Sequence, residues 1–126
     1  MKKNIIIMGI LSTMLGMFSC SSQSQYYERV DAATFAKVIE DKSVVRLDVR
    51  TAGEYSGGHI DGAVNIDVMS GGFETKALAT IPTDKTVALY CQSGNRSRLA
   101  AKILSGKGYK VIELNSGYSG WMRSRR

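Results

Sequence analysis

The chain has few residues of the kinds that build disulfides and metal centres. Its 126 residues include two cysteines, Cys20 and Cys91, and one histidine, His59. Cys20 ends an apolar N-terminal segment, which leaves Cys91 as the one thiol of the chain that follows and excludes a disulfide there. Structural zinc sites use about four Cys or His ligands, more than this set supplies. We therefore expect no metal and no other cofactor, and a fold held by its hydrophobic core alone.

The chain also lacks an apolar run long enough to cross a membrane comfortably. Residues 5–18 are almost entirely apolar and follow the basic start Met1-Lys2-Lys3-Asn4. A basic start before a short apolar run is typical of a secretory signal peptide. The sequence therefore predicts export rather than a transmembrane helix.

The end of the apolar run resembles the signal of a bacterial lipoprotein, in which a cysteine becomes the lipidated first residue. A small residue, Ser19, precedes Cys20, as that signal requires. Met17 and Phe18 depart from its commonest form. Lipidation of Cys20 is the prediction, and ordinary signal-peptidase cleavage or a retained membrane anchor are the alternatives.

This layout divides the chain into three parts. Residues 1–19 are predicted to be a lipoprotein signal peptide, and residues 20–25 the lipidated cysteine with a flexible Ser- and Gln-rich tether. Residues 26–126 have the length of one domain. The lipid would hold the protein in the bacterial cell envelope, on the inner or the outer membrane, with the domain facing the periplasm or the exterior.

The net charge of +6 does not indicate a nucleic-acid partner. Lys2 and Lys3 belong to the N-terminal segment, and Arg123, Arg125 and Arg126 form a cluster at the C-terminal end. No long basic stretch interleaved with aromatic residues accompanies that cluster, so we interpret it as a solvated tail.

Strand-like and helix-like segments alternate along the rest of the chain. Periodicity and turn signals predict strands over 27–30, 44–49, 63–66, 86–90 and 111–114, and helices over 32–40, 52–55, 73–81 and 97–105. Asp31 and Thr51 are predicted helix caps, and a short turn carries Trp121. This order is typical of an α/β domain with a mainly parallel sheet flanked by helices. Because ligands bind beyond the carboxyl ends of such strands, we expect Asp48 and Cys91 to meet there.

The most specific motif is CQSGNRS, residues 91–97, between a buried strand and an amphipathic helix. A small loop with Gly94 can direct its backbone N–H groups toward one point, and the helix start adds positive charge there. Arg96 adds a full positive charge. Together these features favour a thiolate at Cys91, the reactive form of cysteine. The alternative is a buried structural thiol.

Three segments of the chain resemble a single-domain rhodanese, a thiosulfate or persulfide sulfurtransferase. They are LDVRTAGEYSGGHIDGAVNI (47–66), VALYCQSGNRSRLAAKIL (87–104) and GYKVIELNSGYSGW (108–121). The resemblance covers residues 27–123 and implies the rhodanese-like fold. Asn115-Ser116-Gly117 departs from the glycine pair usual in the family, at a structural turn.

The resemblance implies that Cys91 takes sulfur from a small anionic donor and holds it as a persulfide. The acceptor would be a thiol or a cyanide-like nucleophile, or a protein. Loop amides would stabilise the thiolate and the persulfide, and Arg96 would bind the donor anion unless it only caps the helix. Three small, neutral side chains, those of Gln92, Ser93 and Asn95, would form the pocket mouth. The predicted substrate-binding residues are Gln92, Ser93, Gly94, Asn95, Arg96 and Ser97.

Four other residues match family positions that look architectural: Asp48, Arg50, Glu54 and His59. The spacing of Arg50 and Glu54, at the opening of a short helix, favours an ion pair between them. His59 lies in a turn, where we expect it to bond backbone groups. A thiolate stabilised by amides needs no separate general base.

Two other functions compete with sulfur transfer. Cdc25-like phosphatases share this fold and a Cys…Arg loop, but their loop holds one residue more than the four, 92–95, found here. A rhodanese-like domain can also serve as a non-catalytic binding module. Cys91, Gly94 and Arg96 argue against that module, and leave a persulfide carrier that acts only with a partner protein as an alternative.

We predict that Cys20→Ala moves the protein from a lipidated, membrane-bound form to an unprocessed or soluble one. The multiple acyl chains of a mature lipoprotein attach stably, whereas a single chain binds only marginally. Membrane fractionation and the mass of the N-terminal peptide measure the change, and the sulfur chemistry of residues 26–126 should stay the same. A native protein that is soluble and carries no lipid mass would instead indicate a conventional secreted enzyme.

Overall fold

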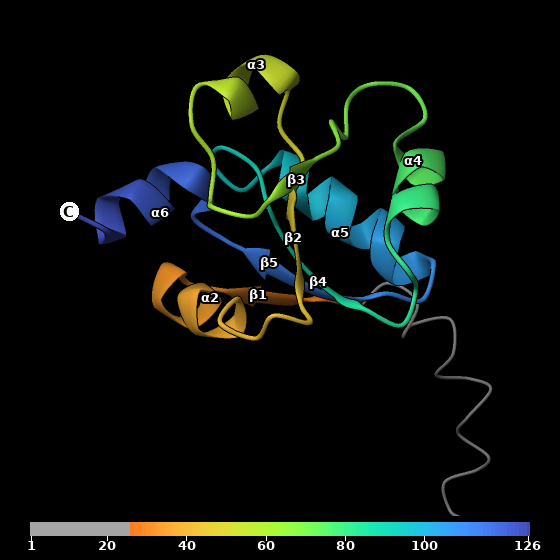
Figure 1. Ribbon diagram of the computed structural model, residues 1–126, viewed down its shortest axis with the longest axis horizontal. Helices are drawn as coiled ribbons and strands as arrows, with labels where there is room; N and C mark the ends of the chain where they lie inside the picture. The colour runs from red at the N-terminus through yellow and green to blue at the C-terminus, as the bar shows by residue number, and fades with distance from the viewer. Residues whose placement is uncertain (1–25) are drawn as a thin grey trace, which may run out of the picture.

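A computed structural model describes residues 26–126, which form one parallel sheet with helices on both faces (Figure 1). The strand order is β1-β5-β4-β2-β3, and every pair of neighbours is parallel. The strands are β1 (Glu28–Val30), β2 (Val45–Asp48), β3 (Val64–Asn65), β4 (Thr86–Tyr90) and β5 (Lys110–Leu114). The helices are α2 (Ala32–Val38), α3 (Ala52–Ser56), α4 (Phe73–Thr80), α5 (Arg96–Gly106) and α6 (Gly117–Ser124).

The predicted α/β fold with a mainly parallel sheet is therefore confirmed. Each predicted strand and helix is present, with ends that differ from the prediction by two residues at most. The predicted signal peptide, Cys20 and the tether lie outside the described residues. Within residues 26–126, none of the helices has the length and apolar character needed to cross a membrane.

Alternation along β4 separates two hydrophobic cores, one on each face of the sheet. Val87 and Leu89 point to the face covered by α4 and α5, while Ala88 and Tyr90 point to the face covered by α2 and α6. Cys91 continues the alternation and joins the first core. Cys91 thus lies on the α5 side of the sheet, next to the start of that helix, where Ser97 Oγ is 3.4 Å from its sulfur.

Local signals in the sequence explain where the first helices begin. The Asp31 side chain accepts a hydrogen bond from the Thr34 N–H at 2.9 Å, as an N-cap does. Thr51 and Glu54 form a reciprocal capping box at the start of α3. Both predicted caps are confirmed. Figure 1 shows α3 beyond the carboxyl end of β2, at the edge of the sheet where ligands bind.

The C-terminal segment corrects one expectation, since Trp121 lies in the eight-residue helix α6 rather than in a short turn. Two glycines give this segment a low intrinsic helix propensity, so its sequence pattern is weak. Packing supplies what propensity lacks. The Trp121 ring meets the edge of the Phe35 ring with centroids 6.1 Å apart, and this contact binds α6 to α2.

We predict that Gly117→Ala destabilises the protein more than Gly108→Ala. Both glycines have a positive φ, +66° and +99°, where an alanine costs about 1–2 kcal/mol. A Cβ at Gly117 would also strike the Gln92 carbonyl, whereas a Cβ at Gly108 meets no atom within 4 Å. Urea unfolding of both variants measures the difference, and equal losses of stability would show that the Gln92 contact is not tight.

Candidate active site around Cys91

The polar residues that follow β2 and β4 meet at the carboxyl edge of the sheet. Asp48 and Tyr90 are register partners at the ends of these strands, so Arg50 and Gln92 emerge side by side. The Arg50 Nη1 donates to Gln92 Oε1 at 2.9 Å. This contact joins the segment after β2 to the segment after β4, so the residues beside Asp48 and Cys91 meet at this edge of the sheet as predicted.

The sulfur of Cys91 is fully buried but lies among polar groups. The Gly94 N–H donates to Sγ at 3.1 Å, and the Ser97 hydroxyl oxygen lies 3.4 Å from Sγ. Burial raises the pKa of the Cys91 thiol. Hydrogen bonds from the Ser97 side chain and from the backbone N–H groups of Ser97, Gly94 and Ser93 outweigh this effect and hold the pKa below its ordinary value. The loop therefore favours the thiolate, the nucleophilic form.

Contacts with α6 and β5 fix the backbone of this loop from behind. The N–H groups of Tyr118 and Ser119 donate to the carbonyls of Cys91 and Gln92 at 2.8 and 3.1 Å. Gly94, with φ +102°, lies so close to the Asn115 carbonyl that a Cβ would strike it. Only glycine fits this approach, and with this backbone the Gly94 N–H faces the sulfur.

The Gln92 side chain does not form the pocket mouth that the sequence suggested. Its Oε1 accepts from Arg50, and its Nε2 donates to Ser119 Oγ at 2.8 Å, so both ends of the amide support the loop. Of the three predicted mouth residues, Ser93 and Asn95 are exposed and Gln92 is half-buried.

The prediction of an ion pair between Arg50 and Glu54 is wrong, because each of these residues pairs with a different partner. Arg50 makes a bidentate pair with Asp48, with Nη2 and Oδ2 2.7 Å apart, and its side chain is 2% exposed. Glu54 pairs with Arg96 through two hydrogen bonds of 2.8 and 3.0 Å. The buried Asp48 carboxylate attracts Arg50 inward, away from the surface where Glu54 lies.

The Glu54–Arg96 pair connects α3 to the start of α5. Hydrogen bonds from Arg96 lower the pKa of Glu54 to about 2. The positive charge of Arg96 is therefore balanced by the Glu54 carboxylate. Arg96 still interacts electrostatically with Cys91, but as one member of an ion pair. Arg96 also stands in the first turn of α5, so it takes part in the structure of the helix start as well as in the charge of the loop.

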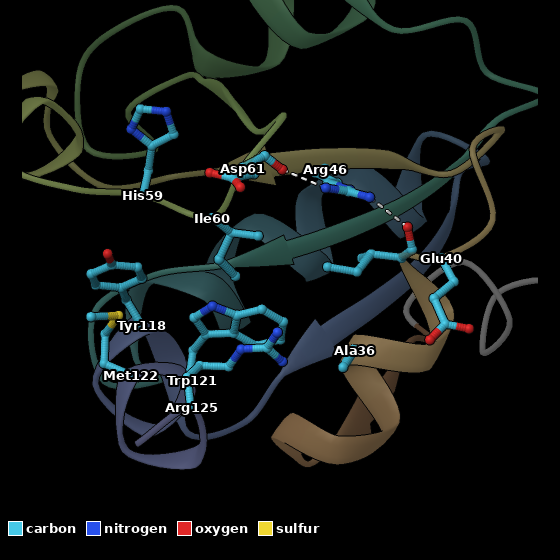
Figure 2. Close-up of a pocket in the computed structure, with 11 residues that line it drawn as sticks. Ala36, Glu40, Arg46, His59, Ile60, Asp61, Tyr118, Trp121, Met122 and Arg125 are labelled. Atoms are coloured by element: carbon cyan, nitrogen blue, oxygen red, sulfur yellow. Dashed lines mark hydrogen bonds between the residues drawn. The ribbon is translucent and has the colours of Figure 1, made fainter.

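His59 lies on the other side of the sheet from the sulfur. Its Nδ1 is 2.9 Å from the Tyr55 carbonyl oxygen, and its ring stacks on the Tyr55 ring with centroids 3.7 Å apart. Figure 2 shows His59 beside a cavity of about 380 Å³ between α2 and α6, which Tyr118 and Trp121 also line. These contacts serve the turn, as expected of His59, and no residue of the 91–97 loop lines this cavity.

Two residues of the site, Glu113 and Arg29, were missed from the sequence. They are register partners on β5 and β1 and form an ion pair, with Arg29 Nε and Glu113 Oε1 2.5 Å apart. Glu113 also accepts a hydrogen bond from the Ser97 hydroxyl. The signal was a single charge inside the apolar run Val111–Leu114, since a charge in a buried strand requires a partner.

Comparison with known proteins gives the chain its relatives. Residues 31–124 match the Rhodanese-like domain family. The chain is 30% identical to the tRNA uridine(34) hydroxylase of Pelagibacter ubique over 98% of its own length and 38% of that protein. It is 27% identical to the thiosulfate sulfurtransferase GlpE of Shewanella oneidensis over 75% of its own length and 92% of that protein.

The likeness extends to solved structures. A rhodanese-related protein from Thermoplasma volcanium matches 78% of this chain and 93% of its own, at 28% identity and a TM-score of 0.68. The chain spans only 19–45% of the length of three larger relatives, the hydroxylase among them. The similarity to those proteins therefore concerns one part of each.

We predict that Glu54→Gln lowers the free energy of unfolding at neutral pH by at most about 1 kcal/mol. The loss is small because solvent screens an ion pair whose carboxylate side chain is 33% exposed. The lowered pKa sets the pH dependence. The contribution is fully present above about pH 4.5 and is lost as the pH falls toward 2. Urea unfolding of both proteins across this range measures it.

Glu74→Gln is the matched control, since it breaks the more exposed pair with Lys107 and should cost less. A stability difference between Glu54→Gln and the unaltered protein that persists unchanged down to about pH 2 would contradict the pairing with Arg96.

Proposed function

Because the chain belongs to the Rhodanese-like domain family, we propose that it is a sulfurtransferase that carries sulfane sulfur as a persulfide on Cys91. Relatives named as sulfurtransferases support sulfur transfer in general. The observation that carries the specific proposal is the hydrogen bond from the Gly94 N–H to Cys91 Sγ, in a loop that lowers the pKa of that thiol.

The proposed reaction has two displacements. The Cys91 thiolate attacks the outer sulfur of thiosulfate, the sulfur–sulfur bond of the donor breaks, and sulfite leaves with the electron pair. A nucleophilic acceptor such as cyanide then attacks the terminal sulfur of the persulfide, which yields thiocyanate and restores the thiolate. Electrons and charges balance in each step, so no external oxidant or reductant is needed.

The loop suits both anionic states of the cysteine. Backbone N–H groups of Ser93, Gly94 and Ser97 hydrogen-bond Sγ in the thiolate. The same dipoles, with the start of α5, would lower the energy of the persulfide, whose charge lies on its terminal sulfur. Four residues between Cys91 and Arg96 leave a small ring of amides, which fits one sulfur better than a tetrahedral phosphate.

We also propose that the protein acts in the bacterial cell envelope, held there by lipid on Cys20. The support is the composition of the N-terminal segment and the polar tether behind it. The physiological acceptor in this proposal is a small thiol or a protein that presents one.

Cys91→Ser should abolish sulfur transfer from thiosulfate to cyanide and leave the fold intact, because a serine hydroxyl forms no persulfide. Thiocyanate formation measures turnover, and intact mass after thiosulfate alone should show one added sulfur that cyanide removes. Cys20→Ser is the matched control and should keep both results.

Other outcomes would redirect the assignment. A mass gain of one sulfur without turnover would favour the partner-dependent carrier. Hydrolysis of an aryl phosphate by the unaltered protein would favour the phosphatase, and full turnover by Cys91→Ser would refute Cys91 as the nucleophile.

A further inference from the structure

A fully buried carboxylate, that of Glu113, lies near Cys91 and has no part in the two displacements. Its side chain is 0% exposed and faces the start of α5 from β5. A buried charge of this kind is costly unless it is paired and hydrogen-bonded. Arg29 supplies the pair through Nε and Nη2, at 2.5 and 3.3 Å from the two carboxylate oxygens.

The Ser97 hydroxyl stands between this carboxylate and the sulfur. Its oxygen is within hydrogen-bond distance of Glu113 Oε2 and lies 3.4 Å from Cys91 Sγ. A serine hydroxyl has one proton to donate and two lone pairs to accept with. When the Ser97 hydroxyl donates its proton to Glu113, its contact with Cys91 is a hydrogen bond only if Cys91 is a thiol, whose S–H donates to the Ser97 oxygen. When Cys91 is a thiolate, it competes with Glu113 for the same proton.

Arg29 connects this network to the loop itself. Its Nη2 lies 3.4 Å from the carbonyl oxygen of Gly94, the residue whose N–H binds Sγ. The guanidinium therefore neutralises Glu113 and touches the loop at the same time. Its side chain is 39% exposed, so it is also the accessible end of the network.

We propose that Glu113, neutralised by Arg29, is a positioning residue that directs the Ser97 hydroxyl and thereby sets the pH at which Cys91 becomes a thiolate. This inference rests on the proposed role of Cys91 as the nucleophile. Deprotonation releases the thiol proton to solvent, and the Ser97 O–H turns from Glu113 to Sγ. Glu113 keeps its two hydrogen bonds from Arg29, so the carboxylate is not left without a partner.

Glu113 differs from the other charged groups around Cys91 in how it acts on the sulfur. Arg96 is held by Glu54, and Arg50 is held by Asp48 and reaches the loop through Gln92. Only the carboxylate of Glu113, among the described residues, is connected to Sγ through a single hydroxyl. The titratable and charged groups that interact with Cys91, or with the three arginines around its loop, are Tyr27, Arg29, Asp48, Arg50, Glu54, Asp67, Tyr90, Arg96 and Glu113.

The geometry fixes the sign of each substitution. Glu113→Gln removes a negative charge and can donate its amide N–H to Ser97 Oγ, which frees the hydroxyl proton for Sγ. The thiolate should then form at a pH lower by about one unit, a tenfold change in the thiolate-to-thiol ratio. Arg29→Gln leaves Glu113 with Ser97 as its main donor and should shift the midpoint upward. Ser97→Ala, which deletes the donor, should also shift it upward.

The test is the rate at which iodoacetamide alkylates Cys91 in the full chain, measured from acid to alkaline pH. Mass spectrometry of the tryptic peptide 86–96 measures Cys91 separately from Cys20, since trypsin cleaves after Lys85 and after Arg96. Glu28→Gln and Arg98→Gln are the matched controls. They remove the same charges at exposed positions on β1 and α5 and should leave the midpoint in place.

Opposite shifts for Glu113→Gln and Arg29→Gln support the proposal, and so does a smaller effect of Glu113→Gln in a Ser97→Ala background. Unchanged midpoints, or shifts that the exposed controls reproduce, overturn it. If Glu113→Gln does not fold, Arg29→Gln at its half-exposed site decides, and an unchanged midpoint there overturns the proposal.

Alkylation reports the thiol whether or not sulfur is transferred. A shifted midpoint in a protein that neither gains sulfur from thiosulfate nor forms thiocyanate would refute the proposed function and leave the role of Glu113 standing.

Discussion

Two close approaches between backbones fix the shape of the Cys91 loop, and both require glycine. Gly94 lies against the Asn115 carbonyl, and Gly117 lies against the Gln92 carbonyl. Each contact brings the end of β5 or the start of α6 directly onto the loop. The N–H groups of the loop face the sulfur because these contacts leave the backbone no other course. The environment of the cysteine thus depends on packing between residues that are 21 and 25 positions apart in the chain.

Three carboxylate–arginine pairs surround the loop, and each binds a different element to it. Asp48–Arg50 joins the end of β2, Glu54–Arg96 joins α3, and Glu113–Arg29 joins β5 and β1. Because every one of these arginines has a carboxylate partner, the region carries little net charge. Stabilisation of the anionic sulfur therefore comes mainly from neutral dipoles, the loop N–H groups and the Ser97 hydroxyl. The pairs hold these dipoles in place.

The sequence predicted the order of elements well, because strand alternation and helix caps are local signals. The capping pattern at Thr51 and Glu54 and the strand before Cys91 needed no knowledge of distant residues. Partners were harder to predict. Arg50 and Glu54 have a suitable spacing in sequence, but burial next to Asp48 outweighs that spacing. Helix α6 was underestimated because its stability comes from Trp121 packing on Phe35, a contact between opposite ends of the domain.

Glu113 was missed for the same reason. The pattern of a strand predicts on which face of the sheet a side chain lies, but not which other side chains it contacts there. Only the pairing of β1 with β5 puts Arg29 opposite Glu113, and only the course of α5 puts Ser97 between Glu113 and the sulfur.

Neutral dipoles have a further consequence for a sulfur carrier. The negative charge stays at minus one throughout the proposed cycle but moves outward by one sulfur–sulfur bond, about 2 Å, when the persulfide forms. A fixed arginine beside Sγ would favour one of these positions and bind the departing anion tightly. Several N–H groups spread along a loop, with a hydroxyl that can turn, follow the charge at lower cost. In this protein the arginines are kept in pairs, so in the proposed cycle the loop would load and unload sulfur without trapping either state.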